Sequence, residues 1–319
     1  MGRPYPVAAS SAVELVLVGP VRSATVVAAT PHATYLDVAD PNRTLLCLAS
    51  ASAVRVPCAL VLESRAFPPQ PPIGTAARVG GGVVALDSGG SFRVQRWWRP
   101  PRPRGLGTAS PARLAAGVGW LTGHVADPLD EGGRAAVAGL VALLTAPGRS
   151  GSAVPVPPEA DLTASVRRLI GRGPGLTPIG DDVLAGALVT LHALGSPLTA
   201  PLARAVRASA PGATTTVSAG LLRLAADGVC IPPLAALLTA LAEGPAAAAP
   251  GGLAPAPVSE ALARAAGALL SVGNTSGAGL LHGVLVAVAI AHARLAPGVL
   301  RTPTVPAPNT PALSVGSAA

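Results

Sequence analysis

Residues 171–188 read "GRGPGLTPIGDDVLAGAL", and this stretch places two adjacent carboxylates between a glycine loop and an apolar run. Four of its five glycines lie within the first ten residues, interrupted by Pro174 and Pro178. Glycine permits unusual backbone angles and proline fixes them, so the stretch predicts a tight loop followed by a helix. Such a loop can turn successive N–H groups toward one side, and the helix start adds its positive dipole end. The sequence therefore predicts an anion cradle.

Several side chains of this stretch are candidates for chemistry. Asp181 and Asp182 are the catalytic candidates, as a base or as a ligand of Mg²⁺, and Asp182 is the metal-ligand candidate. The competing interpretation is structural: one aspartate caps the helix that follows. The candidates for anion binding, by charge, hydroxyl or backbone N–H, are Arg172, Gly173, Gly175, Thr177 and Gly180.

A second stretch, "VGNTSGAGLLHGVL" at residues 272–285, repeats the pattern of the first. When Gly180 is aligned with Gly277, Gly186 falls on Gly283 without a gap. This predicts an internal pseudo-repeat of two glycine loops, each of which feeds a helix. Because glycine lets helices approach closely, Gly186 and Gly283 are expected to bring both loops to one site. The anion-binding candidates of the second loop are Asn274, Thr275, Ser276 and Gly277.

The first third of the chain has the residue pattern of a β domain. Short runs of β-forming residues are separated by turn signals such as "DPN" and "DSGG". These runs predict a small antiparallel sheet or barrel over residues 12–98, followed by a Pro/Arg-rich linker at 99–110. The expected strands are 13–19, 24–29, 33–40, 44–50, 58–64, 81–87 and 91–98.

From residue 111 onward the sequence is rich in Ala and Leu and predicts a helical domain that ends near residue 296. The loop 244–258 and the tail 297–319 have low complexity, and we expect the tail to be disordered. The fold class is therefore α+β, with a small β-rich domain followed by a larger, mostly α-helical one. The expected helices are 111–123, 131–146, 159–171, 180–194, 199–209, 214–227, 232–243, 257–271 and 278–296.

Composition argues against several classes of function. The net charge is +8, but the arginines are scattered and only 2% of residues are aromatic, which disfavours nucleic-acid binding. The three cysteines lack metal-ligand or disulfide spacing, so reduced thiols in the cytoplasm are expected. The apolar run 277–293 is short for a bilayer span and predicts a buried core helix. No pattern indicates a cofactor, apart from the alternative of Mg²⁺ at Asp182.

The two loops resemble the AllH-like family, long described as a domain of unknown function. The family's loop Gly-Pro-Gly-Leu-Thr-Pro-x-Gly-Asp-Asp is matched without a gap from Gly173 to Asp182. Its Thr/Ser run is resembled by "TTTVSAGLLRLAADG" at 214–228. Its third motif is matched from Gly273 to Gly283, except that Gly279 stands where the family usually carries Asp. The resemblance covers most of the chain.

The resemblance implies a subunit of an oxamate carbamoyltransferase of allantoin and purine breakdown, which works with partner enzyme subunits. Its ligands are small anions: oxamate, oxalurate, carbamoyl phosphate or phosphate. Two interpretations stay open. In the first, the chain is an enzyme subunit; in the second, it is a non-catalytic anion-binding or regulatory module that lost one carboxylate at Gly279. A Mg²⁺-dependent kinase is less favoured, because the sequence lacks a nucleotide loop.

Overall fold

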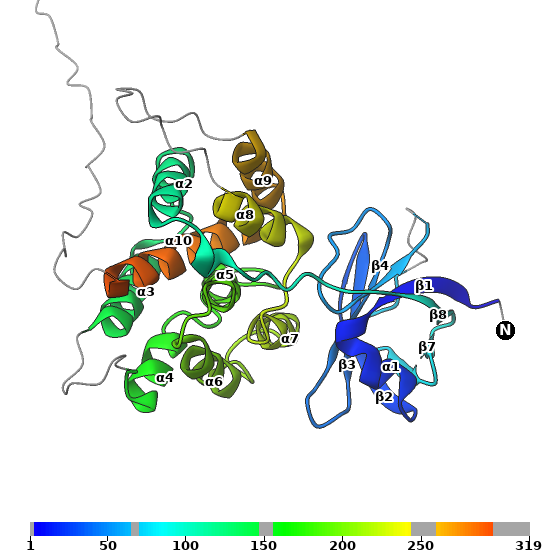
Figure 1. The fold of residues 1–319 in the computed structure, drawn as a ribbon. Helices are drawn as coiled ribbons and strands as arrows, with labels where there is room; N and C mark the ends of the chain where they lie inside the picture. The colour runs from blue at the N-terminus through cyan, green and yellow to red at the C-terminus, as the bar shows by residue number, and fades with distance from the viewer. Residues whose placement is uncertain (1–2, 65–69, 147–155, 244–259, 296–319) are drawn as a thin grey trace, which may run out of the picture.

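The computed structural model describes residues 3–64, 70–146, 156–243 and 260–295. A β-barrel formed by the first hundred residues lies beside a larger helical region, and the two are joined by a single extended crossing of the chain (Figure 1). The α+β fold class predicted from the sequence is confirmed, as is the barrel alternative for its N-terminal part. The predicted loop 244–258 and tail 297–319 lie outside the described residues.

The barrel closes in the order β1-β5-β4-β3-β2-β6-β7-β8, with β8 returning to β1. Two neighbouring pairs, β1 with β8 and β4 with β5, are parallel, and the other pairs are antiparallel. Large apolar side chains such as Leu36, Leu48, Leu60 and Phe92 are fully buried in its core. The strands are β1 (Tyr5–Ser10), β2 (Arg22–Thr30), β3 (Ala33–Val38), β4 (Leu45–Ala49), β5 (Ala59–Leu62), β6 (Ala76–Gly80), β7 (Val83–Leu86) and β8 (Ser91–Trp98).

One strand prediction was wrong and two strands were missed. The predicted strand 13–19 is mainly the helix α1 (Glu14–Val18), preceded by a 3₁₀ turn, η1 (Ser11–Val13). Val13 and Leu17 are buried whereas Leu15 is 87% exposed, so this apolar run has the four-residue period of a helix rather than alternation. The missed strands are β1, which begins among prolines, and β6, which is short and rich in alanine.

All nine predicted helices are present, with ends that differ by a few residues. Helix α7 packs against strands β4 and β2, and its Val217 belongs to the barrel core. A second 3₁₀ turn, η2 (Leu106–Thr108), buries Leu106 in the helical core. The helices are α2 (Pro111–His124), α3 (Glu131–Thr145), α4 (Glu159–Arg167), α5 (Ile179–Leu194), α6 (Thr199–Ser209), α7 (Thr216–Ala225), α8 (Pro232–Glu243), α9 (Glu260–Leu270) and α10 (Ser276–Leu295).

Helices α5 and α10 form the centre of the helical region, and their contact is the most extensive between any two elements of the described chain. Twelve of the sixteen residues of α5 are buried. Helix α10 is long and apolar enough to cross a membrane by length and composition, but half of its apolar window is buried against other helices. The prediction that residues 277–293 form a core helix is therefore confirmed.

Candidate functional site

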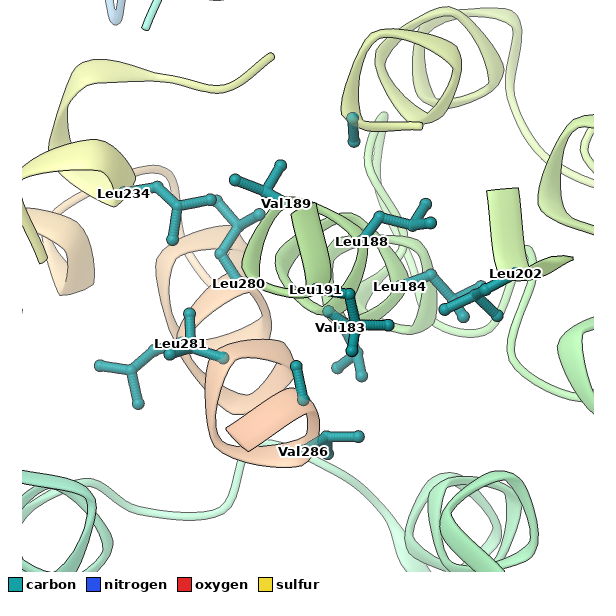
Figure 2. Packing of buried hydrophobic residues seen from close by; sticks show 14 of the residues in the cluster. Val183, Leu184, Leu188, Val189, Leu191, Leu202, Leu234, Leu280, Leu281 and Val286 are labelled. Carbon is teal, nitrogen blue, oxygen red and sulfur yellow. The ribbon is translucent and has the colours of Figure 1, made fainter. Parts of the chain in front are cut away.

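Helices α5 and α10 cross at glycines with almost no space between their backbones. A Cβ built on Gly186 would collide with the carbonyl oxygen of Leu280, and one built on Gly283 would collide with that of Val183. The Gly283 Cβ would also lie 2.9 Å from the Cα of Gly186. Figure 2 shows the two helices in contact here, with Val183, Leu280 and Val286 near the crossing. The close approach predicted for Gly186 and Gly283 is therefore present.

The contacts across this crossing are reciprocal. Gly186 packs on Leu280, and Gly283 packs on Val183. Gly283 is the equivalent of Gly186 in the repeat, and Leu280 is the equivalent of Val183, since each lies 97 residues later. Reciprocal contacts of this kind are the mark of a two-fold relation between two similar units. The pseudo-repeat read from the sequence therefore exists in space, as two loop–helix units that pack face to face.

The residues before α5, which we call loop 1 (171–178), expose unused backbone donors. Gly173 and Gly175 adopt φ angles of +109° and +96°, which only glycine tolerates easily. Within the described residues, the N–H groups of Gly173, Gly175, Leu176 and Thr177 donate to no protein acceptor. The N–H of Gly180, by contrast, donates to the carbonyl of Arg172. Four such donors therefore lie in loop 1 itself, whereas the N–H groups of Gly180, Asp181 and Asp182 in the first turn of α5 donate to protein carbonyls.

Asp181 is buried and fully engaged. One of its oxygens accepts from the N–H of Gly171 at 2.8 Å; the other accepts from the hydroxyls of Thr214 and of Ser218, the latter at 2.7 Å. Thr215 caps α7 by accepting from the N–H of Ser218, and it donates to the carbonyl of Leu176. Asp181 and the Thr/Ser run thus tie loop 1 to the start of α7, which makes this aspartate a positioning residue.

Asp182, the next residue, has the opposite environment. Its side chain is turned inward, the residue is 7% exposed, and Oδ2 is buried without a hydrogen-bond partner among the described residues. Burial raises the pKa of this carboxyl to about 8; a hydrogen bond from Ser276 lowers the pKa in part, and the nearby charge of Asp181 raises it. The raised pKa therefore favours the protonated form of Asp182 at neutral pH.

Ser276, the first residue of α10, joins the two halves of the site. Its Oγ lies 2.8 Å from Oγ1 of Thr177, a residue of loop 1 that is 99 positions away in sequence. The other anion-binding candidates of this region are Asn274, Thr275 and Gly277. Asn274 and Thr275 belong to loop 2 (271–275), which precedes α10, and both are exposed. Gly277 is packed against the carbonyl of Leu269 and donates its N–H to that of Val272. Only Ser276 among these four reaches loop 1 through its side chain.

Arg172 does not present a free charge to the loop. Its guanidinium donates two hydrogen bonds to the carboxylate of Asp130, at 2.9 and 2.8 Å, and it lies against Gly132. This pairing lowers the pKa of Asp130 and raises that of Arg172. Asp130 was not predicted from the sequence, because it lies 42 residues away and nothing in the spacing connects the two. Arg172 is thus better suited to fixing loop 1 against the start of α3 than to holding an anion.

His282 lies two turns into α10 and faces a second acidic residue of the segment before α3. Its Nδ1 is 3.8 Å from Oδ1 of Asp127. Burial lowers the pKa of the imidazole, and the charge of Asp127 raises it in part. The partner of His282 is therefore an aspartate of the protein.

These residues do not fit a Mg²⁺ site. Magnesium is bound by ionised carboxylates and retains several water molecules. Both oxygens of Asp181 are occupied by protein donors, Oδ2 of Asp182 is enclosed, and Gly279 contributes no side chain. The described residues contain no group of three or more His, Cys, Asp or Glu side chains that could hold a metal ion.

Comparison with known protein families matches part of the chain. No curated protein and no solved structure matches the chain. Residues 169–288, which contain loop 1, α5, α7, loop 2 and most of α10, match the family described as oxamate carbamoyltransferase subunit AllH. The AllH family match that the two glycine loops predicted is therefore present over residues 169–288, which is less than half of the chain, and the match does not extend over most of the chain as expected.

Proposed function

We propose that the protein is a subunit of an oxamate carbamoyltransferase-type enzyme and binds a small anion at loop 1, beside Ser276. The family description associates the matched region with this enzyme. The observation that carries the anion site is the contact between Thr177 and Ser276, at 2.8 Å, because it brings loop 1 and its unused N–H groups to the start of α10. Two helix N-termini then act on one place.

The protonation of Asp182 supports this proposal. A carboxylate beside the cradle would repel oxamate, oxalurate, carbamoyl phosphate or phosphate. Because burial raises the pKa of Asp182 to about 8, the neutral form is favoured at neutral pH and that repulsion is reduced. The N–H groups of loop 1 would stabilise negative charge that develops on a carbamoyl or phosphate oxygen during transfer.

The alternative is a non-catalytic binding module, and one observation favours it. Oδ2 of Asp182 is enclosed, and a Cβ on Gly279 would lie 2.7 Å from the Cβ of Asp182, which leaves no room for the second carboxylate usual in the family. A module that only binds an anion would keep loop 1 and need neither acid.

Calorimetric titration of the purified protein tests the anion site. Oxamate, oxalurate, carbamoyl phosphate and phosphate would each be titrated with and without Mg²⁺ into the wild type, Asp182→Asn and, as a control, Asp87→Asn, which alters an exposed turn of the barrel. Micromolar binding of one anion, independent of Mg²⁺ and unchanged in the control, is the expected result. If a folded wild type binds none of them, the anion site is wrong for the isolated chain.

An activity assay of the chain assembled with partner subunits distinguishes an enzyme subunit from a non-catalytic binding module. We expect transfer of the carbamoyl group only when this chain is combined with the other subunits, and we place that assembly in the cytoplasm. For an enzyme subunit, Asp182→Asn abolishes turnover of the assembly; for a binding module, the same variant changes affinity and leaves turnover intact.

A further inference from the structure

A hollow of about 250 Å³ lies on the outer face of the barrel, over strand β1 and its neighbours β5 and β8. Val7 and Ala9 belong to the barrel core, so Ala8 between them points outward. Ala8 pairs with Val61 of β5 and with Arg96 of β8, and all three line the hollow. Because alanine is small, the middle strand leaves a depression between the larger side chains on either side.

A β-bulge turns two consecutive side chains of β8 toward this hollow. Val7 pairs with Val94 and Ala8 pairs with Arg96, so Gln95 is the extra residue of the bulge. In a regular strand Gln95 and Arg96 would point to opposite faces, but both line the hollow. Bulges that redirect side chains in this way are over-represented at barrel rims and beside active sites. The bulge therefore brings an amide and a guanidinium to one place.

The lining of the hollow combines charge with an apolar wall. Arg55, from the connection between β4 and β5, and Arg96 both line it, and neither has an ion pair among the described residues. The ring of Trp98 is held in place, because its Nε1 donates to the carbonyl of Ala59 at 3.2 Å. Glu63 adds one acceptor. A fitting ligand has a carboxylate for the arginines, an apolar stem for Trp98 and an N–H donor for Glu63, and a glutamate within a peptide has all three.

The basic charge continues from the hollow along the chain. Residues 93–104, "RVQRWWRPPRPR", contain five arginines and no acid. In the crossing that joins the barrel to the helical region (Figure 1), the prolines are half-buried and the arginines are exposed. The N–H of Cys230 donates to the carbonyl of Pro101 at 3.0 Å, so the backbone of the crossing is fixed at this point. The five exposed arginines of this stretch are Arg93, Arg96, Arg99, Arg102 and Arg104.

The chain itself leaves these arginines without an acid. All 15 acidic residues lie in the described part of the chain, and none of them forms an ion pair with Arg55 or with the five arginines of residues 93–104. The remaining segments, residues 65–69, 147–155, 244–259 and 296–319, contain no Asp or Glu in their sequences. An acidic side chain that pairs with this surface therefore has to come from another molecule.

We propose that the hollow and the arginines of residues 93–104 form a docking surface for a glutamate-rich segment of a partner protein, with one glutamate side chain in the hollow. Charge complementarity would select such a segment, and Arg and Trp are the residue types that contribute most at protein interfaces. A nucleic acid fits less well, because Glu63 would repel its phosphates but can accept a hydrogen bond from a peptide N–H. The inference goes beyond the proposed function and does not depend on its anion site, since no residue of loop 1 lines the hollow.

Fluorescence anisotropy of a labelled peptide tests the docking surface on the full chain. The probe alternates glutamate with glycine and is as long as residues 93–104; the same peptide with glutamine in place of glutamate is the control. We expect micromolar binding of the glutamate peptide, weakened by salt because exposed charges are screened, and no binding of the glutamine peptide. Arg55→Gln/Arg96→Gln should weaken binding by about tenfold or more. The matched control, Arg167→Gln/Arg204→Gln, removes two exposed arginines of the helical region and should change the affinity by less than about twofold.

A second variant distinguishes the hollow from charge alone. Ala8→Leu fills the floor of the hollow and changes no charge, so it should weaken peptide binding by about tenfold while circular dichroism shows a folded protein. If Ala8→Leu is folded and binds like the wild type, the glutamate does not enter the hollow and the proposal is overturned. If Ala8→Leu does not fold, Arg55→Gln/Arg96→Gln decides, because both of its substituted side chains are exposed.

Three further outcomes would overturn the proposal. A folded wild type that does not bind the glutamate peptide overturns it and leaves the anion site at loop 1 standing. A labelled single-stranded oligonucleotide of equal length that binds more tightly than the glutamate peptide overturns it in favour of a nucleic acid. Self-association of the wild type in sedimentation experiments, abolished by Arg55→Gln/Arg96→Gln, overturns it in favour of a second copy of the chain.

Discussion

The two loop–helix units share their packing and differ in their chemistry. In the first unit, Gly180 packs against the carbonyl of Leu169; in the second, Gly277 packs against the carbonyl of Leu269. Each helix then meets the other through a second glycine, Gly186 or Gly283, on equivalent carbonyls. The two helices therefore cross in the same way in both units, whereas the segments that precede them differ: the N–H of Gly180 donates to the carbonyl of Arg172, eight residues earlier, and that of Gly277 to the carbonyl of Val272, five residues earlier.

The difference lies in the first turn of each helix. The acids Asp181 and Asp182 open α5, whereas the positions 97 residues later are Ala278 and Gly279 in α10. The equivalent positions Asp182 and Gly279 are in direct contact. Two side chains could not fit at this point without moving the helices apart. The repeat thus preserves the crossing in both units and places the acid pair in only one.

The largest expected loss of stability comes from breaking the shared packing. Gly186→Ala or Gly283→Ala should destabilise the protein by about 3 kcal/mol, because each new Cβ meets a backbone carbonyl that cannot move alone. Urea denaturation of each variant measures the change. Gly267→Ala is the control: it lies in α9 with nothing within 4 Å of its Cβ, and it should be stabilised by about 0.5 to 1 kcal/mol. Equal stabilities of Gly186→Ala and the wild type would contradict the crossing.

The next effect comes from making the first unit resemble the second at Asp181. Asp181→Ala copies Ala278 and removes the acceptor of three donors: the Gly171 N–H and the hydroxyls of Thr214 and Ser218. Because those donors would stay partly buried, we expect a loss of about 2 kcal/mol in the free energy of unfolding. Hydrogen exchange should show loop 1 and the start of α7 opening together. If loop 1 alone becomes labile, Asp181 does not couple it to α7.

A third effect concerns the pH dependence contributed by Asp182. The unfolded carboxyl titrates near the ordinary aspartate pKa of 3.8 and the folded one near 8, so between these values the folded state retains a proton that the unfolded state has released. Asp182 therefore lowers the free energy of unfolding by an amount that grows as the pH rises from about 3.8 to 8 and that is constant above pH 8. Asp182→Asn should therefore become more stable relative to the wild type between about pH 5 and pH 8.5, by on the order of 4 kcal/mol. Melting temperatures of the wild type and of Asp182→Asn at both pH values measure the gain.

The smallest effect is expected at Arg172. Its ion pair with Asp130 is exposed, and such pairs contribute little and are screened by salt. Arg172→Gln should lower the melting temperature only slightly at low salt and not at all in about 0.5 M salt. Anion affinity, measured by calorimetry, should change by less than about threefold, as expected when an exposed charge already has a partner. A loss of anion affinity larger than about tenfold, or 1.4 kcal/mol, would show that Arg172 binds the anion, as the sequence predicted.

The sequence by itself determined the order of the helices from residue 111 onward and the central crossing. Nine helices were predicted from their Ala/Leu-rich stretches, and the repeated glycines predicted the contact between α5 and α10. These signals are local, or are repeated in the chain at a fixed spacing, so they can be read without coordinates. The helix at residues 14–18 was misread, because five apolar-rich residues fit a strand as well as a helix until burial shows the period.

The tertiary structure alone decided which side chains of the site are free. The sequence treated Asp181, Asp182 and Arg172 alike, as charges beside a loop. In the fold, Asp181 accepts from donors up to 37 residues away, and Arg172 is paired across 42 residues. Asp182 keeps an oxygen without a partner among the described residues, beside Ser276 of a distant helix. Burial and partners are set by contacts between remote segments, and these determine whether a carboxyl is a charge, an anchor or an acid.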